Sequence, residues 1–200
     1  MIDYDMYVKT LQEISIDKSK LKEGIIDYAS NSLKEAVDFD KFQEDYFKSI
    51  NPKMKKPKSV DALCFLDGKW CLIEFKNGFV SYEEICGKIG NSVSTILFKD
   101  NLSPKEFKEN SIFILVYNKN KAFKNKDGKL NEEKYLLEEE IVESHSFDEF
   151  SRNLTELSGK PIISFKLGTI QNVYFSKVKT MDKEIFNKYI EMKNVVAYKK

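Results

Sequence analysis

The sequence predicts an α/β protein in which helices flank a mixed central sheet, and three observations within one stretch of chain carry that prediction. An Asp-Gly pair at 67–68 separates two apolar, aromatic-rich runs, which is a strong sign of a two-residue hairpin turn. A helical pattern follows at 81–98, and a continuous apolar run at 111–118 is typical of a strand buried on both faces. Neither an all-α fold nor a simple sandwich predicts the order strand, strand, helix, strand.

The hairpin decides which side chains face one another. If residues 67–68 form the turn, the residue numbers of every cross-strand pair sum to 135, which sets Asp61 opposite Glu74. Side chains alternate along a strand, so Lys76 lies on the same face as Glu74. We therefore expect two carboxylates and one ammonium group to converge on one patch.

Two opposed carboxylates repel each other and are costly to desolvate, so they need a compensating positive charge. A divalent cation supplies that charge, and a small set of hard oxygen ligands suits Mg²⁺ or Mn²⁺ better than zinc. The ammonium of Lys76 beside such a cation can hold a water or neutralise a phosphorane, as phosphodiester hydrolysis requires. The alternative is a hairpin that ends in solvent, where these side chains are ordinary surface charges.

Asp61, Glu74 and Lys76 resemble the motif of the PD-(D/E)XK nuclease superfamily, although Val60 stands where the motif has proline. The resemblance covers residues 58–76 and implies a restriction-endonuclease-like core. It also implies that Asp61 and Glu74 bind Mg²⁺ or Mn²⁺ and that Lys76 assists the water, the three together forming the catalytic set. Members often take a further acidic ligand from the preceding helix. Glu44 is the candidate here, with a solvated surface Glu as the alternative.

The resemblance implies a metal-dependent nuclease that hydrolyses phosphodiester bonds in DNA, with RNA as the alternative substrate. One alternative is a catalytically silent module of the same fold that binds nucleic acid or a protein partner within a larger assembly. Another is an ordinary α+β interaction domain. Lysines near the motif are the candidate phosphate contacts, against the alternative that a lysine-rich chain scatters them by chance. They are Lys53, Lys55, Lys56, Lys58 and Lys88.

Further elements follow from periodicity and capping motifs. Apolar spacing predicts helices over 38–50 and 182–192, and Ser-initiated caps predict helices over 81–98 and 146–157. Strands are expected at 162–167 and 173–178, residues 19–37 look helical, and residues 119–129 form a basic loop. In the last helix, we expect the inward side chains to be Ile185, Phe186, Tyr189 and Ile190.

Length and composition fit one domain over residues 1–200, with N-terminal helices (1–50), a hairpin and core (58–118) and a C-terminal extension (119–200). A net charge of +1 does not mark a simple high-affinity DNA binder, so the distribution of lysines matters more than their sum. Without an 18-residue apolar run or a signal-peptide pattern, we expect a cytoplasmic protein with no membrane partner. A protein partner and homo-oligomerisation both stay open.

Three cysteines are an odd number, which argues against a disulfide framework. The hairpin register makes Cys64 and Cys71 cross-strand neighbours on the face opposite Asp61, Glu74 and Lys76. We therefore expect them, together with Cys86, to be reduced core residues.

Overall fold

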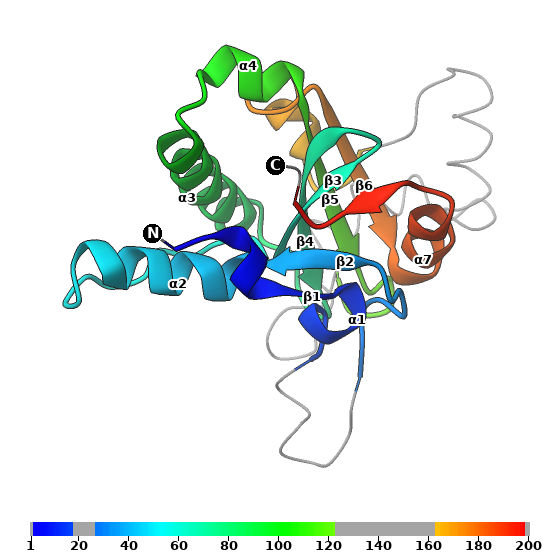
Figure 1. Cartoon of the computed structure of the whole chain (residues 1–200). Coiled ribbons are helices and arrows are strands. Elements are labelled where there is room, and N and C mark those ends of the chain that lie inside the picture. The colour runs from blue at the N-terminus through cyan, green and yellow to red at the C-terminus, as the bar shows by residue number, and fades with distance from the viewer. Residues whose placement is uncertain (1, 18–26, 123–162, 199–200) are drawn as a thin grey trace.

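The structure, a computed structural model, describes residues 2–17, 27–122 and 163–198. Within that part of the chain a seven-stranded mixed sheet has the order β1-β2-β3-β4-β5-β6, and β7 also pairs with β3 (Figure 1). Strands β1 to β4 are antiparallel neighbours, whereas β4, β5 and β6 are parallel. The predicted α/β class with a mixed central sheet is confirmed. The strands are β1 (Val8–Thr10), β2 (Glu35–Asp38), β3 (Ala62–Leu66), β4 (Lys69–Lys76), β5 (Ser111–Tyr117), β6 (Lys177–Asp182) and β7 (Val195–Val196).

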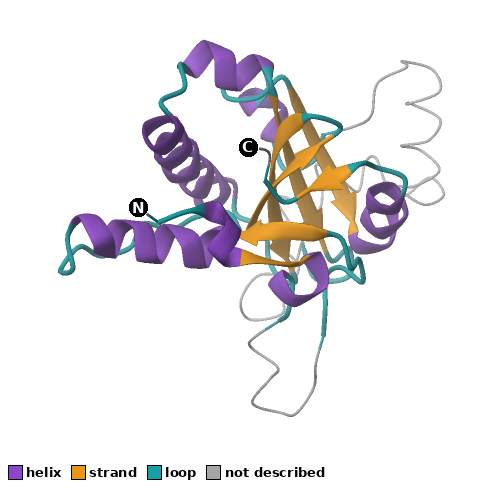
Figure 2. Ribbon diagram, in the orientation of Figure 1, coloured by secondary structure: helices purple, strands orange, loops and turns teal. Residues whose placement is uncertain are grey.

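Helices cover both faces of this sheet (Figure 2). On one face lie α2 (Phe39–Ile50), α3 (Tyr82–Asp100) and α4 (Pro104–Glu109), which contribute Phe42, Ile89 and Phe107 to the larger core. On the other face lie α1 (Leu11–Ile14) and α7 (Lys183–Glu191), which contribute Leu11 and Phe186 to a second core. Two short 3-10 helices, η1 (Tyr4–Tyr7) and η3 (Leu167–Ile170), complete the described elements.

The β3–β4 hairpin has the predicted turn and register. Asp67 and Gly68 both have positive φ, 51° and 82°, as the tight hairpin turn between right-twisted strands requires. Ala62 pairs with Ile73, and the pairing continues to Leu66 and Lys69 at the turn. Cys64 is paired with Cys71, and both are free thiols in the core on the α7 side, as predicted.

The two helices that bear on the site begin at side-chain caps. The Asp38 carboxylate accepts a hydrogen bond from the Lys41 amide at the start of α2, and the Ser81 hydroxyl accepts one from the Glu84 amide at the start of α3. Helix α3 ends where Asn101 adopts the left-handed conformation, φ 52°. The predictions for 38–50 and 81–98 are therefore confirmed, with α3 two residues longer.

Strand β5 lies between β4 and β6, and every one of its residues is buried. Its side chains alternate between the two cores, with Phe113 and Leu115 on the α3 face and Ile112 and Ile114 on the α7 face. The continuous apolar run at 111–118 predicted this position, because a strand covered on both faces needs no polar side.

Several sequence expectations are wrong. Residues 27–37 are not helical, because Ile16 forms a β-bridge with Tyr28 and Glu35–Asp38 is strand β2. The described part of 162–167 is not a strand, because Phe165 and Lys166 have positive φ, 60° and 58°. The domain description of 1–50 as helices is corrected in the same way, since β1 and β2 lie there.

Two elements expected near the C-terminus are present, but the strand has different boundaries. The expected strand at 173–178 is β6, which begins at Lys177 and continues to Asp182 because its ladder follows β5. The helix at 182–192 is confirmed as α7, but Ile185 points outward, with 48% of the residue exposed. The helix expected at 146–157 and the loop after residue 122 lie outside the described residues. Of the helices that the structure describes, none is long and apolar enough to cross a membrane.

Replacing Phe113 by Ala should lower the free energy of unfolding by about 3 to 5 kcal/mol, because the ring is fully buried in the central strand and packs on Phe175 at 5.6 Å. Urea denaturation measures the change. The matched control is Phe98→Ala, which should change stability by less than about 0.5 kcal/mol because that residue is 79% exposed. Equal effects of the two substitutions would contradict the central position of β5.

Candidate active site

Asp61 is fixed by backbone contacts at the point where β3 begins. Its amide donates to the carbonyl of Ile73, and its carbonyl accepts from the amide of Phe39 at the start of α2. The preceding residue, Val60, donates its amide to the buried hydroxyl of Ser92 on α3. The carboxylate of Asp61 accepts from the Phe75 amide at 2.7 Å through Oδ2, which leaves Oδ1 directed toward α3. The strand ladder itself ends at Ala62, so these contacts hold Asp61 in place.

Glu74 is the most buried charged side chain of the site, with 1% of it exposed. Its Oε1 accepts a 2.6 Å hydrogen bond from Nζ of Lys88 on α3, and the same ammonium lies 3.8 Å from Oδ1 of Asp61. Lys88 therefore bridges the two carboxylates. Among the described residues, Oε2 of Glu74 is a buried oxygen with no hydrogen-bond partner.

Lys76 extends this cluster toward the start of α3. Its Nζ lies 3.7 Å from Oε1 of Glu74 and 3.0 Å from Oε1 of Glu84, and Lys58 approaches Glu84 to 3.9 Å. The structure thus brings the predicted Asp61, Glu74 and Lys76 together. It adds Lys88 as the residue that joins them.

The cluster is electrostatically coupled. Burial, followed by repulsion from Asp61, raises the pKa of Glu74 to about 8, against the opposing effect of Lys88. Burial also raises the pKa of Asp61. Burial alone lowers the pKa of Lys88, but Asp61 and Glu74 outweigh it, so the pKa of this lysine lies above its ordinary value. At Glu84, burial raises the pKa, but the hydrogen bond from Lys76 and the charges of the neighbouring lysines together outweigh burial, so the pKa of that carboxyl is lowered.

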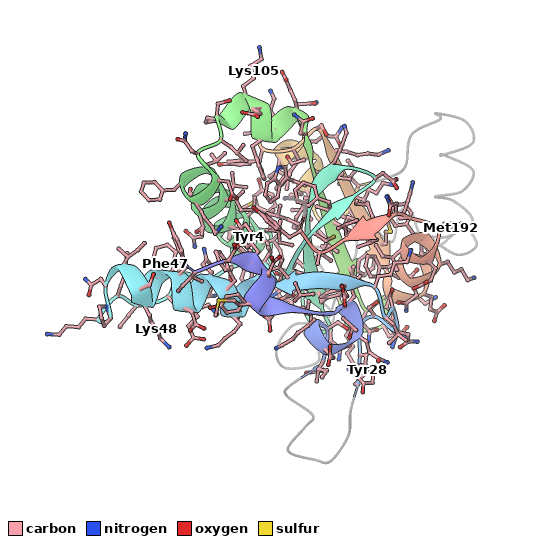
Figure 3. All side chains as sticks on the ribbon, in the orientation of Figure 1. Tyr4, Tyr28, Phe47, Lys48, Lys105 and Met192 are labelled. Carbon is pink, nitrogen blue, oxygen red and sulfur yellow. The ribbon has the colours of Figure 1, made fainter. Side chains whose placement is uncertain are left out.

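Glu44, the candidate third ligand, pairs with lysines of its own helix, α2. Its carboxylate pairs with Lys48 at 2.5 Å and with Lys41 at 3.4 Å, and Figure 3 shows Lys48 pointing outward from the helix. The α2 acid that reaches the cluster is Asp40. It accepts from the Ser59 hydroxyl at 2.7 Å and raises the pKa of Asp61. No signal in the local sequence singled out Asp40 for this role, because Asp40 and Glu44 lie on the same helix.

The five candidate phosphate contacts divide into two groups. Lys53, Lys55 and Lys58 are exposed on the segment between α2 and β3. Lys56 is only partly exposed and pairs with Asp40 at 2.5 Å, while Lys88 lies between the two carboxylates. The segment that precedes Asp61 therefore presents three lysines to solvent and uses a fourth to anchor itself.

The donor set fits Mg²⁺ or Mn²⁺ in one specific way. Across residues 2–17, 27–122 and 163–198, no three acidic, histidine or cysteine residues are grouped as a complete metal site. Mg²⁺ commonly uses only one or two carboxylates and takes its other ligands from water and substrate phosphates. Asp61 and Glu74 provide two, and within the described part of the chain the buried Oε2 of Glu74 receives no hydrogen bond.

Comparison of the chain with family models, with curated proteins and with solved structures gives no match. The geometry of Asp61, Glu74, Lys76 and Lys88 therefore carries the functional argument.

The raised pKa of Glu74 makes stability depend on pH. Between the ordinary value of 4.5 and about 8, the folded state holds a proton on Glu74 that the unfolded state has released. Without divalent ions, the free energy of unfolding of the wild type should therefore fall as pH rises through this window, by up to about 1.4 kcal/mol per pH unit.

Glu74→Gln lacks this proton, so its stability relative to the wild type should increase from pH 5 to pH 8. Urea denaturation in EDTA across this range provides the measurement. Parallel curves for the two proteins would mean that Lys88 keeps Glu74 ionised when folded.

Proposed function

We propose that this protein is a metal-dependent nuclease with a restriction-endonuclease-like core, acting on DNA with Mg²⁺ or Mn²⁺. The observation that carries the proposal is the cluster in which Lys76 and Lys88 approach Oε1 of the buried Glu74 and Lys88 also approaches Asp61, while Oε2 of Glu74 has no hydrogen-bond partner among the described residues. Buried charges of this kind, with shifted pKa values and exposed lysines alongside, are typical of functional sites rather than of packing.

Each residue of the cluster has its own role in this proposal. Asp61 and Glu74 would hold the cation, which when bound polarises a phosphate and acidifies a water. Lys76, held by Glu84 at 3.0 Å, is positioned to orient that water or to neutralise charge that develops on the phosphate oxygens. Lys53, Lys55 and Lys58 lie where they can contact neighbouring phosphates.

Lys88 must change partners in this proposal. Its ammonium supplies the positive charge that Asp61 and Glu74 need in the cation's absence. When the carboxylates bind a divalent ion, electrostatic repulsion would release Lys88 toward the substrate phosphate. Lys88 thus contacts phosphate only in the metal-loaded state, which keeps it among the nucleic-acid-binding residues.

The second candidate function is a catalytically silent module that binds nucleic acid or a protein partner, and the same lysine favours it. Lys88 already compensates both carboxylates, so their charge alone does not demand a metal. The two functions differ in whether a divalent ion displaces Lys88.

With Mg²⁺ or Mn²⁺, the wild type should cleave DNA, and Lys76→Ala should lose at least about 100-fold in rate while still binding DNA, because Lys76 acts on the reacting phosphate. Gel-resolved cleavage and fluorescence anisotropy measure the two properties. The matched control is Lys105→Ala, on an exposed residue of α4 (Figure 3), which should cleave as the wild type does. If the pure protein cleaves neither DNA nor RNA, alone or with a native partner, the silent module replaces the nuclease.

Reversing the charges at Lys53 and Lys55 together should weaken DNA binding for all sequences and reduce its salt dependence by about one unit of slope per lost contact. The control is the double variant Lys105→Glu/Lys188→Glu, which changes the net charge equally at exposed positions of α4 and α7. Affinity measured at several salt concentrations distinguishes them. Equal weakening in both double variants would show that only the net charge matters.

Mg²⁺ should raise the melting temperature of the wild type by mass action, and Asp61→Asn should reduce that increase. Lys88→Met should enlarge it, because the two carboxylates then lack their internal cation. The control Lys48→Met removes an exposed lysine that pairs only with Glu44 among the described contacts, and it should respond as the wild type does. An identical Mg²⁺ response in all four proteins would place the ion elsewhere.

A further inference from the structure

The far end of α2 carries large apolar side chains that face solvent. Figure 1 shows α2 extending beyond the sheet, with the chain turning back at its end. Ile50, the last residue of the helix, is 57% exposed, and Met54, just after it, is 46% exposed. We call residues 50–55 the α2 tip. Two such side chains close together at a projecting end form a candidate contact surface.

The α2 tip is held in one conformation by backbone hydrogen bonds. The Asn51 carbonyl accepts from the Met54 amide at 2.9 Å, which closes a four-residue turn with Pro52 at its second position. The Asn51 side chain accepts from the Lys53 amide at 3.0 Å, and the Asn51 amide donates to the carbonyl of Phe47 in α2. The tip is therefore ordered before it meets a partner, which lowers the entropy cost of binding.

The charge around the apolar side chains is positive. Lys53 and Lys55 are exposed on either side of Met54 in the sequence. The acids in this half of α2, Glu44 and Asp45, each pair with a lysine of the same helix. Apolar groups between exposed lysines complement a partner with phosphates outside and an apolar interior, which describes duplex DNA and also an anionic membrane.

Helix α2 connects the tip to the proposed active site. Ile73 and Phe75 of β4 belong to the core on the α7 side, so Glu74 between them lies on the face that α2 and α3 cover. The start of α2 is joined to the site, because the Phe39 amide donates to the Asp61 carbonyl at 3.0 Å. The helix has 12 residues, so the tip lies about 17 Å from this junction along the axis, the length of about five base steps.

The chain that returns from the tip favours DNA over a membrane. Beyond Lys53 and Lys55 it carries Lys58, which is exposed and approaches Glu84 at 3.9 Å. Glu84 also holds Lys76, so basic groups continue from the tip into the carboxylate cluster. A DNA backbone can follow this row of lysines from the tip to the site, whereas a membrane that receives the tip gives those nearer the site no phosphate to contact.

We infer that the α2 tip inserts Ile50 and Met54 between two base pairs of duplex DNA, while Lys53 and Lys55 contact the adjacent phosphates. The inference rests on the proposed function and specifies its substrate as a duplex that is kinked about five base pairs from the reacting phosphate. Isoleucine, methionine and proline are among the residues that unstack a base step in this way, and the resulting bend brings more of the backbone against the protein.

DNA bending tests the inference without cleavage. The full chain is titrated in EDTA into a short duplex that carries an energy-transfer pair at its ends and 2-aminopurine at internal positions. Binding does not need the metal, because Lys88 compensates the two carboxylates. The wild type should bend the duplex by at least about 20° and raise the 2-aminopurine fluorescence, since a wedge unstacks bases.

The double variant Ile50→Ser/Met54→Ser should leave the duplex straight and bind it about tenfold more weakly, because two apolar side chains no longer leave water. Its salt dependence should equal that of the wild type, because no phosphate contact is lost. The control Ile185→Ser/Met192→Ser changes two apolar residues of the α7 region that are 48% and 78% exposed, and it should bind and bend DNA as the wild type does. Circular dichroism and melting curves check that each variant folds.

Three results would overturn the inference. The first is a duplex that the wild type does not bind, or binds without bending. The second is equal affinity and bending in the wild type and both double variants. The third is binding of phosphatidylserine-containing vesicles that only the Ile50→Ser/Met54→Ser variant loses, with DNA binding unchanged, which would assign the tip to a membrane surface.

The two proposals fail separately. Bending in EDTA that depends on Ile50 and Met54, with no metal-dependent cleavage by the same protein, would leave the wedge standing and remove the nuclease. Metal-dependent cleavage of a duplex that stays straight, at the same rate in the wild type and in Ile50→Ser/Met54→Ser, would leave the nuclease standing and remove the wedge.

Discussion

The hydrogen bond from Lys88 to Glu74 is the interaction on which the site depends. A carboxyl group that is 99% covered, on a strand inside a sheet, needs a hydrogen-bond donor and can ionise only beside a positive charge, and the Lys88 ammonium at 2.6 Å provides both. Helix α3 must therefore lie against β4 at the level of residue 74. That placement also brings Ser92 to the Val60 amide, which orders the chain before Asp61. Strand, helix and Asp61 are positioned by one requirement, the compensation of a buried charge.

The same contact makes the ionisation of Glu74 sensitive to the charges around it. The pKa of Glu74 is raised to about 8, so small changes in the nearby positive charge decide whether this carboxyl is ionised. Asp40 and Glu84 lie outside this centre and hold lysines of their own, Lys56 and Lys76. Asp40 and Glu84, which are partly exposed, thus hold two lysines in place around the buried Glu74. The lysines are fixed in position, while the charge of Glu74 can change.

Sequence reasoning was accurate where the local signal was strong and the contact was near in sequence. The Asp-Gly turn decided the hairpin register, and the unbroken apolar run at 111–117 identified the central strand. Short strands were missed. β2 has only four residues and pairs through a ladder with β1 and β3 that the local sequence does not reveal. β6 was misplaced because its boundaries come from the parallel register with β5, about sixty residues earlier in the chain.

In the site, too, contacts within one strand were predicted and contacts between distant segments were not. Alternation along β4 predicted that Glu74 and Lys76 share a face, but Lys88 was expected to face phosphate, because its contact with Glu74 depends on how α3 packs across the sheet. Helical spacing alone also could not distinguish Glu44 from Asp40. Both lie on α2, and only the turn of the chain from Ser59 into β3 brings Asp40 near Asp61.

The two-residue turn at Asp67 and Gly68 gives the hairpin an unusual sensitivity to changes in length. One residue inserted between the turn and Glu74 would rotate every following side chain of β4 to the opposite face. Glu74 would then point toward Cys64 and Phe186 in the second core, and Lys88 would lose its nearest carboxylate. Evolution can vary the side chains of this hairpin one at a time. Its length can change only in steps that restore the alternation, so relatives with a working site should differ here by pairs of residues or by none.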